Sequence, residues 1–131
     1  WINKYKPRLS RGPKERLEWA ATITRKEYLE AKEEREKIIK YFKEFLPKDT
    51  VLCLPTAASI APLRTDSLEE INKTRLQSSY LLCISPLTGT PQITIPLVML
   101  DDMPLGLTLI GAEGTDMELV RFALDIAKSY K

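Results

Sequence analysis

Residues 85–111, SPLTGTPQITIPLVMLDDMPLGLTLIG, hold the pattern that decides the fold. Within them, residues 92–95 and 105–110 are two β-rich runs of alternating character, bounded by prolines and glycines. Residues 101–104, DDMP, are typical of a turn, because aspartate side chains bond nearby backbone N–H groups and proline fixes φ. We therefore predict two neighbouring antiparallel strands, whose apolar faces helices must cover.

Helices are predicted on both sides of this stretch. After an extended start over residues 1–12, a short helix is expected to begin near Pro13, a residue favoured at the first helical position. A long helix follows from about residue 24 to about residue 46, where Pro47 ends it. A third helical segment opens at residue 66, and its continuation over residues 80–87 is apolar nearly all round, which predicts burial.

Capping boxes mark the start of three helices, at residues 24–27, 66–69 and 115–118. The last of them opens a terminal helix with one apolar stripe. Its expected core-facing residues are Leu119, Phe122, Ala123, Ile126 and Tyr130.

A third strand is predicted at residues 50–54, TVLCL, which Pro55 stops. Its continuous apolar character indicates burial on both faces, and hence a sheet between two layers of helices. The loop of small residues at 55–62 leaves the end of this strand, where ligands usually sit in α/β sheets. Since three strands are few for such a sheet, we expect that its other strands lie outside this sequence.

Length and composition indicate a single segment, and the order of the predicted elements makes it α/β, helical over residues 1–47 and mixed in strands and helices over residues 48–131. No apolar run approaches the ~20 residues of a bilayer span, and residues 1–4 lack a signal-peptide core, so we expect a cytoplasmic protein without a membrane partner. Residues 1–50 hold fourteen Lys/Arg against nine Asp/Glu, a charge of +5. The basic start is compatible with nucleic acid or an acidic partner, but a solvated approach to the first helix is favoured.

Catalytic chemistry is limited by the absence of histidine, which excludes a Ser-His-Asp or Cys-His site within the chain. Cys53 and Cys83 lie in apolar runs and are predicted to be buried free thiols rather than zinc ligands or a disulfide. Thr56, near a strand end, and Arg16, on the first helix, are candidates for substrate contact. From the residues alone, loop capping and a surface arginine are the favoured interpretations.

Several motifs in order resemble one known family. They are residues 51–57, VLCLPTA, residues 88–96, TGTPQITIP, and residues 103–111, MPLGLTLIG, followed by Asp116 and Leu119. Together they look like the C-terminal portion of amidase-signature hydrolases. The resemblance implies an α/β/α sandwich with a mixed β-sheet flanked by helices. It also implies hydrolysis of a carboxamide C–N bond by a Ser, cis-Ser and Lys set, which this sequence does not contain.

The resemblance implies site residues too. Residues 55–58 and 79–85 match part of the acyl-side substrate wall, which points to Thr56, Ser79 and Cys83 as substrate-binding residues. Arg16 matches a position that helps hold the substrate carboxylate in the glutaminyl-tRNA amidotransferase branch, where the assisting aspartate would fall near Ser79. No catalytic residue, metal or cofactor is expected in this chain.

These arguments predict a C-terminal amidase segment that is inactive alone and works with the N-terminal catalytic part of the same enzyme on a small amide substrate. A homo-oligomer is a further expected partner. The alternative is a non-catalytic, amidase-like interaction module that covers its open strand edge by self-association. A basic nucleic-acid-binding domain is a second, less favoured alternative.

Overall fold

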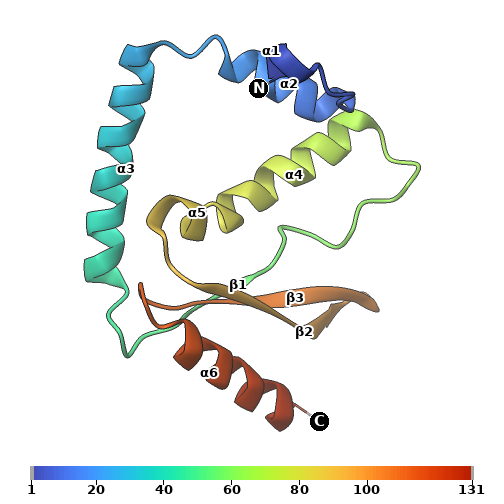
Figure 1. Ribbon diagram of the computed structural model, residues 1–131. Helices are drawn as coiled ribbons and strands as arrows, with labels where there is room; N and C mark the ends of the chain where they lie inside the picture. The colour runs from blue at the N-terminus through green and yellow to red at the C-terminus, as the bar shows by residue number, and fades with distance from the viewer. Residues whose placement is uncertain (1, 131) are drawn as a thin grey trace. The chain divides into compact units, whose positions relative to one another are not determined.

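A computed structural model describes residues 2–130 of the chain (Figure 1). The chain divides into two compact units, residues 1–34 and residues 35–131. The helix α3 (Arg25–Phe45) contributes residues to both. Among the described residues, no helix combines the length and the hydropathy that a bilayer span requires.

The first unit is helical and its described residues are mostly exposed. The expected extended start is wrong at its beginning, because α1 (Ile2–Tyr5) forms one helical turn there. The helix α2 (Arg11–Ala20) begins two residues before Pro13, so proline is its third residue instead of its first. Neither helix contains a buried residue among those described.

The capping box before α3 is confirmed. The Glu27 carboxylate accepts a hydrogen bond from the Thr24 N–H at 2.8 Å, and the Thr24 hydroxyl accepts one from the Glu27 N–H at 3.3 Å. These bonds satisfy two of the N–H groups that a helix start leaves without a helical partner.

The second unit is built on a three-stranded antiparallel sheet in the order β1-β3-β2, from β1 (Leu52–Pro55), β2 (Gln92–Leu100) and β3 (Met103–Ile110). The predicted antiparallel pairing of the last two strands is confirmed. Both strands are longer than predicted, because the turn needs only two residues. Asp101 and Asp102 have φ of 50° and 60°, the left-handed pair of a type I′ hairpin turn. A bulge after Ile95 accommodates Pro96 in the strand.

One face of the sheet packs against α6 (Asp116–Ser129), as Figure 1 shows. The buried core there is Ile95, Leu109, Leu119 and Ala123. The predicted inward positions of Phe122 and Tyr130 are wrong, since these side chains are 44% and 69% exposed. A sheet of three strands is too narrow to cover the full apolar stripe of the helix.

The predicted capping box at the start of α6 is also wrong. The Thr115 hydroxyl donates to the carbonyl of Ala112 at 2.8 Å, and Thr115 makes no side-chain bond to the helix N-terminus. Its backbone φ of −101° and ψ of 31° differ from the extended conformation of a capping residue.

Two burial predictions are wrong. β1 is an edge strand whose residues alternate between half-buried and exposed, and Cys53 is exposed although its thiol is free as predicted. In the segment formed by the end of α4 (Leu68–Leu82) and α5 (Ile84–Thr88), Tyr80 is 69% exposed. Cys83, between the two helices, is half-buried and free.

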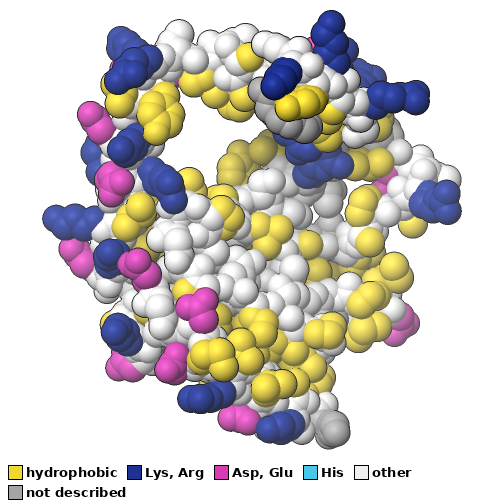
Figure 2. Space-filling view, viewed as in Figure 1, with side chains coloured by type: hydrophobic (Ala, Val, Ile, Leu, Met, Phe, Trp, Pro, Cys, Tyr) yellow, Lys and Arg dark blue, Asp and Glu magenta, His cyan; other side chains and the backbone are white. Residues whose placement is uncertain are grey.

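Exposed hydrophobic side chains gather over α6 and the β2–β3 hairpin in Figure 2. They include Met99, Leu100, Met103, Phe122 and Leu124. The α/β class is thus confirmed, with apolar surface left open beside the narrow sheet.

Candidate functional site

The sheet face opposite α6 carries three hydrogen-bonded threonines. The Thr108 hydroxyl, on the central strand β3, lies 2.8 Å from the Thr56 hydroxyl and 3.2 Å from the Thr94 hydroxyl. Thr108 is only 1% exposed. A buried hydroxyl is costly unless it is hydrogen-bonded, and these contacts satisfy it. We call Thr56, Thr94 and Thr108 the threonine row.

Gly106 leaves the space that Thr56 and Thr94 occupy in the threonine row. A Cβ atom at this position would lie 2.6 Å from the Thr56 hydroxyl oxygen and 2.6 Å from the Thr94 methyl group. The Thr56 N–H also donates to the Gly106 carbonyl at 2.8 Å, which extends the β1–β3 pairing by one residue. Glycine is therefore required here because a side chain would not fit between Thr56 and Thr94. Backbone conformation is not the reason, since the φ of Gly106 is not positive.

Beside the row lies a cavity of about 420 Å³ between the loop after β1, the helix α4 and the start of β3. Residues 71, 74, 75 and 78 of α4 share one helix face toward it, at the spacing i, i+3, i+4 and i+7. The Ser78 hydroxyl accepts a hydrogen bond from the Ala58 N–H at 3.2 Å, which ties the loop to the helix. The lining includes Thr56, Ser59, Ile71, Thr74, Arg75 and Ser78.

The helix that lines the cavity has a complete capping box, one residue later than predicted. Ser67 is the N-cap, and its hydroxyl and backbone N–H both donate to the Glu70 carboxylate, at 2.6 Å and 2.9 Å. The hydrogen bond from the Ser67 hydroxyl, and then that from its backbone, lower the pKa of Glu70 below its ordinary value. The cap fixes where α4 begins.

Of the four residues predicted to contact substrate, only Thr56 lies at this cavity among the described lining residues. Ser79 is one position past the lining face, and its hydroxyl donates to the Arg75 carbonyl at 2.8 Å. The Cys83 thiol lies 3.5 Å from the Tyr80 carbonyl oxygen. Arg16 is exposed on α2, in the first unit. A substrate role for these four residues stays a prediction.

Arg75 and Ser78 were not predicted from the sequence. Their spacing with Ile71 and Thr74 after a capping box indicates a shared helix face, but it does not by itself indicate a binding role. Arg75 is the one charged residue among the described lining residues. Its guanidinium forms no ion pair with a carboxylate in the part of the chain that the structure describes.

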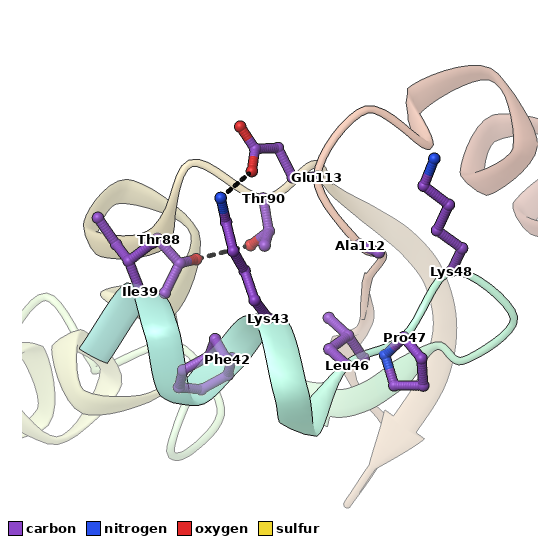
Figure 3. Close-up of a pocket in the computed structure, with 10 residues that line it drawn as sticks. All are labelled: Ile39, Phe42, Lys43, Leu46, Pro47, Lys48, Thr88, Thr90, Ala112 and Glu113. Carbon is purple, nitrogen blue, oxygen red and sulfur yellow. Dashed lines mark hydrogen bonds and ion pairs between the residues drawn. The ribbon is translucent and has the colours of Figure 1, made fainter. Parts of the chain in front are cut away.

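A second cavity, of about 240 Å³, lies beside the end of α3 and shows a different chemistry (Figure 3). Its apolar wall includes Leu46, which is buried. Four of its polar side chains pair with one another: Lys43 with Glu113 at 3.1 Å, and the Thr88 hydroxyl with the Thr90 hydroxyl at 2.9 Å (Figure 3). We interpret it as a packing hollow, and the cavity at the threonine row as the candidate site.

A metal centre has no support in residues 2–130, where no three His, Cys, Asp or Glu side chains come together. The candidate site therefore offers hydroxyls, apolar contacts and one guanidinium. Such groups bind and orient a small polar ligand.

Comparison with known proteins identifies the family. The family model for amidases matches residues 6–120. Amidase 1 from Arabidopsis thaliana is 25% identical over 116 residues, which cover 88% of this chain and 27% of that protein. Amidase 1 from Oryza sativa subsp. japonica is 30% identical over 117 residues, again with 88% and 27% covered. The mitochondrial outer envelope protein 64 of Arabidopsis thaliana is 32% identical over 88 residues, which cover 66% of this chain and 15% of that protein.

Solved structures share the fold. A crystal structure of an amidase superposes with a TM-score of 0.72 at 22% identity and covers 96% of this chain and 30% of its own. A subunit of the glutamyl-tRNA(Gln) amidotransferase from Thermotoga maritima superposes with a TM-score of 0.67 at 19% identity, covering 91% and 27%. This chain spans about a quarter of the length of the two plant amidases that it matches. By the match over residues 6–120, the chain belongs to the amidase family.

Proposed function

We propose that this chain is the C-terminal segment of an enzyme that hydrolyses a carboxamide C–N bond. In this reaction, water adds its hydroxyl group to the acyl carbon, the C–N bond breaks, and the nitrogen leaves with a proton. The family's Ser, cis-Ser and Lys lie on polypeptide outside these 131 residues, and the segment alone is inactive. Family membership over residues 6–120 carries the proposal.

The cavity at the threonine row supports a binding role for the segment. Ile71 and Leu105 supply apolar contact for an acyl group, while Thr56, Ser59 and Ser78 bring hydroxyls to the same space. The first residues of the loop between β1 and α4 are held in place, because the Thr56 N–H donates to the Gly106 carbonyl and the Ala58 N–H donates to the Ser78 hydroxyl. A preformed wall of this kind orients the substrate at low entropic cost.

The test compares the full encoded polypeptide with the 131-residue segment. Both are assayed for ammonia release from a panel of aliphatic and aromatic primary carboxamides. We expect turnover only from a polypeptide that contains the family's Ser and Lys, and loss of turnover when that Lys is replaced by Ala. Turnover by the isolated segment, or turnover that survives the Lys→Ala change, contradicts the proposal.

A second candidate function is a non-catalytic, amidase-like interaction module. It is favoured by the similarity to one relative that is named an outer envelope protein. The open edges of β1 and β2 and the exposed side chains near the hairpin supply surface for self-association or for a partner. Sedimentation of the full polypeptide decides this: concentration-dependent dimers without any amide turnover support the module, and an active monomer rejects it.

Two further expectations belong to the proposal. We place the protein in the cytoplasm, and cell fractionation with a tagged full-length polypeptide checks this. We also expect no specific nucleic-acid binding by the basic first unit. Binding that is tight and falls steeply with salt concentration would contradict that expectation.

A further inference from the structure

We propose that Arg75 makes the cavity at the threonine row selective for an anionic group, so that the substrate is an amide that also carries a carboxylate. This inference rests on the proposed function and names the substrate class of the same site.

The first observation is the position of Arg75. It follows Ile71 by one helical turn and precedes Ser78 by three residues, so it shares the α4 face that lines the cavity. Its backbone carbonyl accepts the Ser79 hydroxyl at 2.8 Å, a contact that leaves the guanidinium unused. No described carboxylate pairs with that guanidinium, and no acidic residue is found among the described lining residues.

Two acidic residues at the start of α4 have hydrogen-bond partners away from Arg75. The Glu70 carboxylate accepts from Ser67, and the Asp66 carboxylate accepts the Leu63 N–H at 2.8 Å. Arg75, whose guanidinium carries five donors, is therefore the one charged residue at a cavity with no acidic residue among its described lining residues. A carboxylate is the planar anion that this fork binds in a bidentate manner.

The neighbouring hydroxyls complete an anion site. The Ser78 oxygen accepts the Ala58 N–H, so its own proton is free to be donated into the cavity. Thr74 adds a second hydroxyl on the same helix face. The volume of about 420 Å³ holds a small molecule with its carboxylate at α4 and an apolar chain along Ile71 and Leu105.

The binding experiment uses the full encoded polypeptide and two probes of equal length, succinate and the neutral diamide succinamide. Succinate is not an amide, so calorimetry reports its affinity whether or not the protein has turnover. We expect succinate to bind more tightly than succinamide, and Arg75→Gln to weaken succinate binding about fivefold without affecting succinamide. Arg75→Lys should retain part of the affinity, since it keeps the charge but loses the bidentate geometry.

The matched control is Arg64→Gln. Arg64 is an exposed arginine in the loop between β1 and α4, and it is not among the described lining residues of the cavity. It should leave succinate affinity unchanged, and thermal unfolding should be alike for all three variants because both arginines are exposed. Equal affinities for succinate and succinamide, or equal losses in the Arg75 and Arg64 variants, overturn the inference.

Kinetics separate this inference from the proposed function. With the monoamide succinamate, Arg75→Gln should raise KM and leave kcat unchanged, whereas neutral amides should show no change. Hydrolysis of neutral amides together with no effect of Arg75 retains the proposed function and rejects the inference. Arg75-dependent succinate binding without any hydrolysis rejects the enzyme and retains the anion site.

Discussion

The two faces of the three-stranded sheet are equally buried at their centres but differ in chemistry. Leu109 is 0% exposed and packs under α6 with Leu119, while its neighbour Thr108 is 1% exposed and faces the other way, bonded to two hydroxyls. Successive residues of a strand point to opposite faces, so one strand supplies both surfaces. The comparison teaches that the α6 face serves stability and that the threonine face combines burial with polar groups beside a cavity.

The largest effect should come from the apolar face. Leu109→Ala removes a fully buried side chain between Ile95 and Leu119, and we expect it to lower the free energy of unfolding by about 2–5 kcal/mol. Urea unfolding followed by circular dichroism measures this. The control is Leu124→Ala, which changes an exposed residue of α6 and should cost less than about 0.5 kcal/mol. Equal losses in the two variants would show that α6 does not cover the core as described.

The next effect tests how the threonine face closes. Gly106→Ala places a Cβ atom 2.6 Å from Thr56 and from Thr94, so we expect a loss of about 1–3 kcal/mol in unfolding free energy. Succinate binding should weaken as well, because Thr56 and Gly106 both line the cavity. The double variant with Thr94→Ser removes one clashing methyl group and should recover part of the stability. No recovery would mean that the loss arises elsewhere.

A smaller effect is expected from the buried hydroxyl itself. Thr108→Val keeps the shape of the side chain but removes the oxygen that joins Thr56 and Thr94, at a cost of about 1 kcal/mol. Urea unfolding measures the cost, and Thr94→Val, at an exposed position, should cost less. If Thr108→Val stabilises the protein, the hydrogen bonds of Thr108 do not contribute to the free energy of unfolding. Both faces of the sheet would then be stabilised by apolar packing alone.

The smallest effect is the pH dependence of the α4 cap, beside the threonine face. The pKa of Glu70 is lowered in the folded chain, so its contribution to stability is present above the ordinary value of 4.5 and is lost as the pH falls through the lowered folded value. Thermal unfolding between pH 3 and pH 6 should therefore be less pH-dependent in Glu70→Gln than in the wild type. Glu69→Gln, in the same helical turn, is the control. An unchanged pH profile in Glu70→Gln contradicts this role of the cap.

Local signals in the sequence predicted much of the fold. The β2–β3 hairpin, its two-aspartate turn and the Thr24 capping box were all readable from residues close in the chain, and the motif order indicated the family. The exact start of α4 could not be predicted from the sequence. Asp66 and Ser67 both match an N-cap, and only the hydrogen bonds between Ser67 and Glu70 distinguish them.

Only one lining residue of the candidate cavity was named from the sequence. Thr56 was named because it follows a strand, where α/β ligand sites usually lie, and its substrate role stays a prediction. Arg75 and Ser78 could not be preferred over other helix residues, since their value depends on the loop that packs against them. Ser79, one position away, bonds its own helix instead.

By itself the sequence determined most of the strands and the longer helices, although not their exact bounds, because hydrophobic periodicity, turn residues and caps act over two to four neighbouring positions. Only the tertiary structure decided that Cys53 and Phe122 are exposed, that Thr108 is buried, and that Gly106 must lack a side chain. The physical reason is that burial and close approach are set by residues far away in the chain, such as Thr56 and Thr108, which are 52 positions apart and yet share a hydrogen bond.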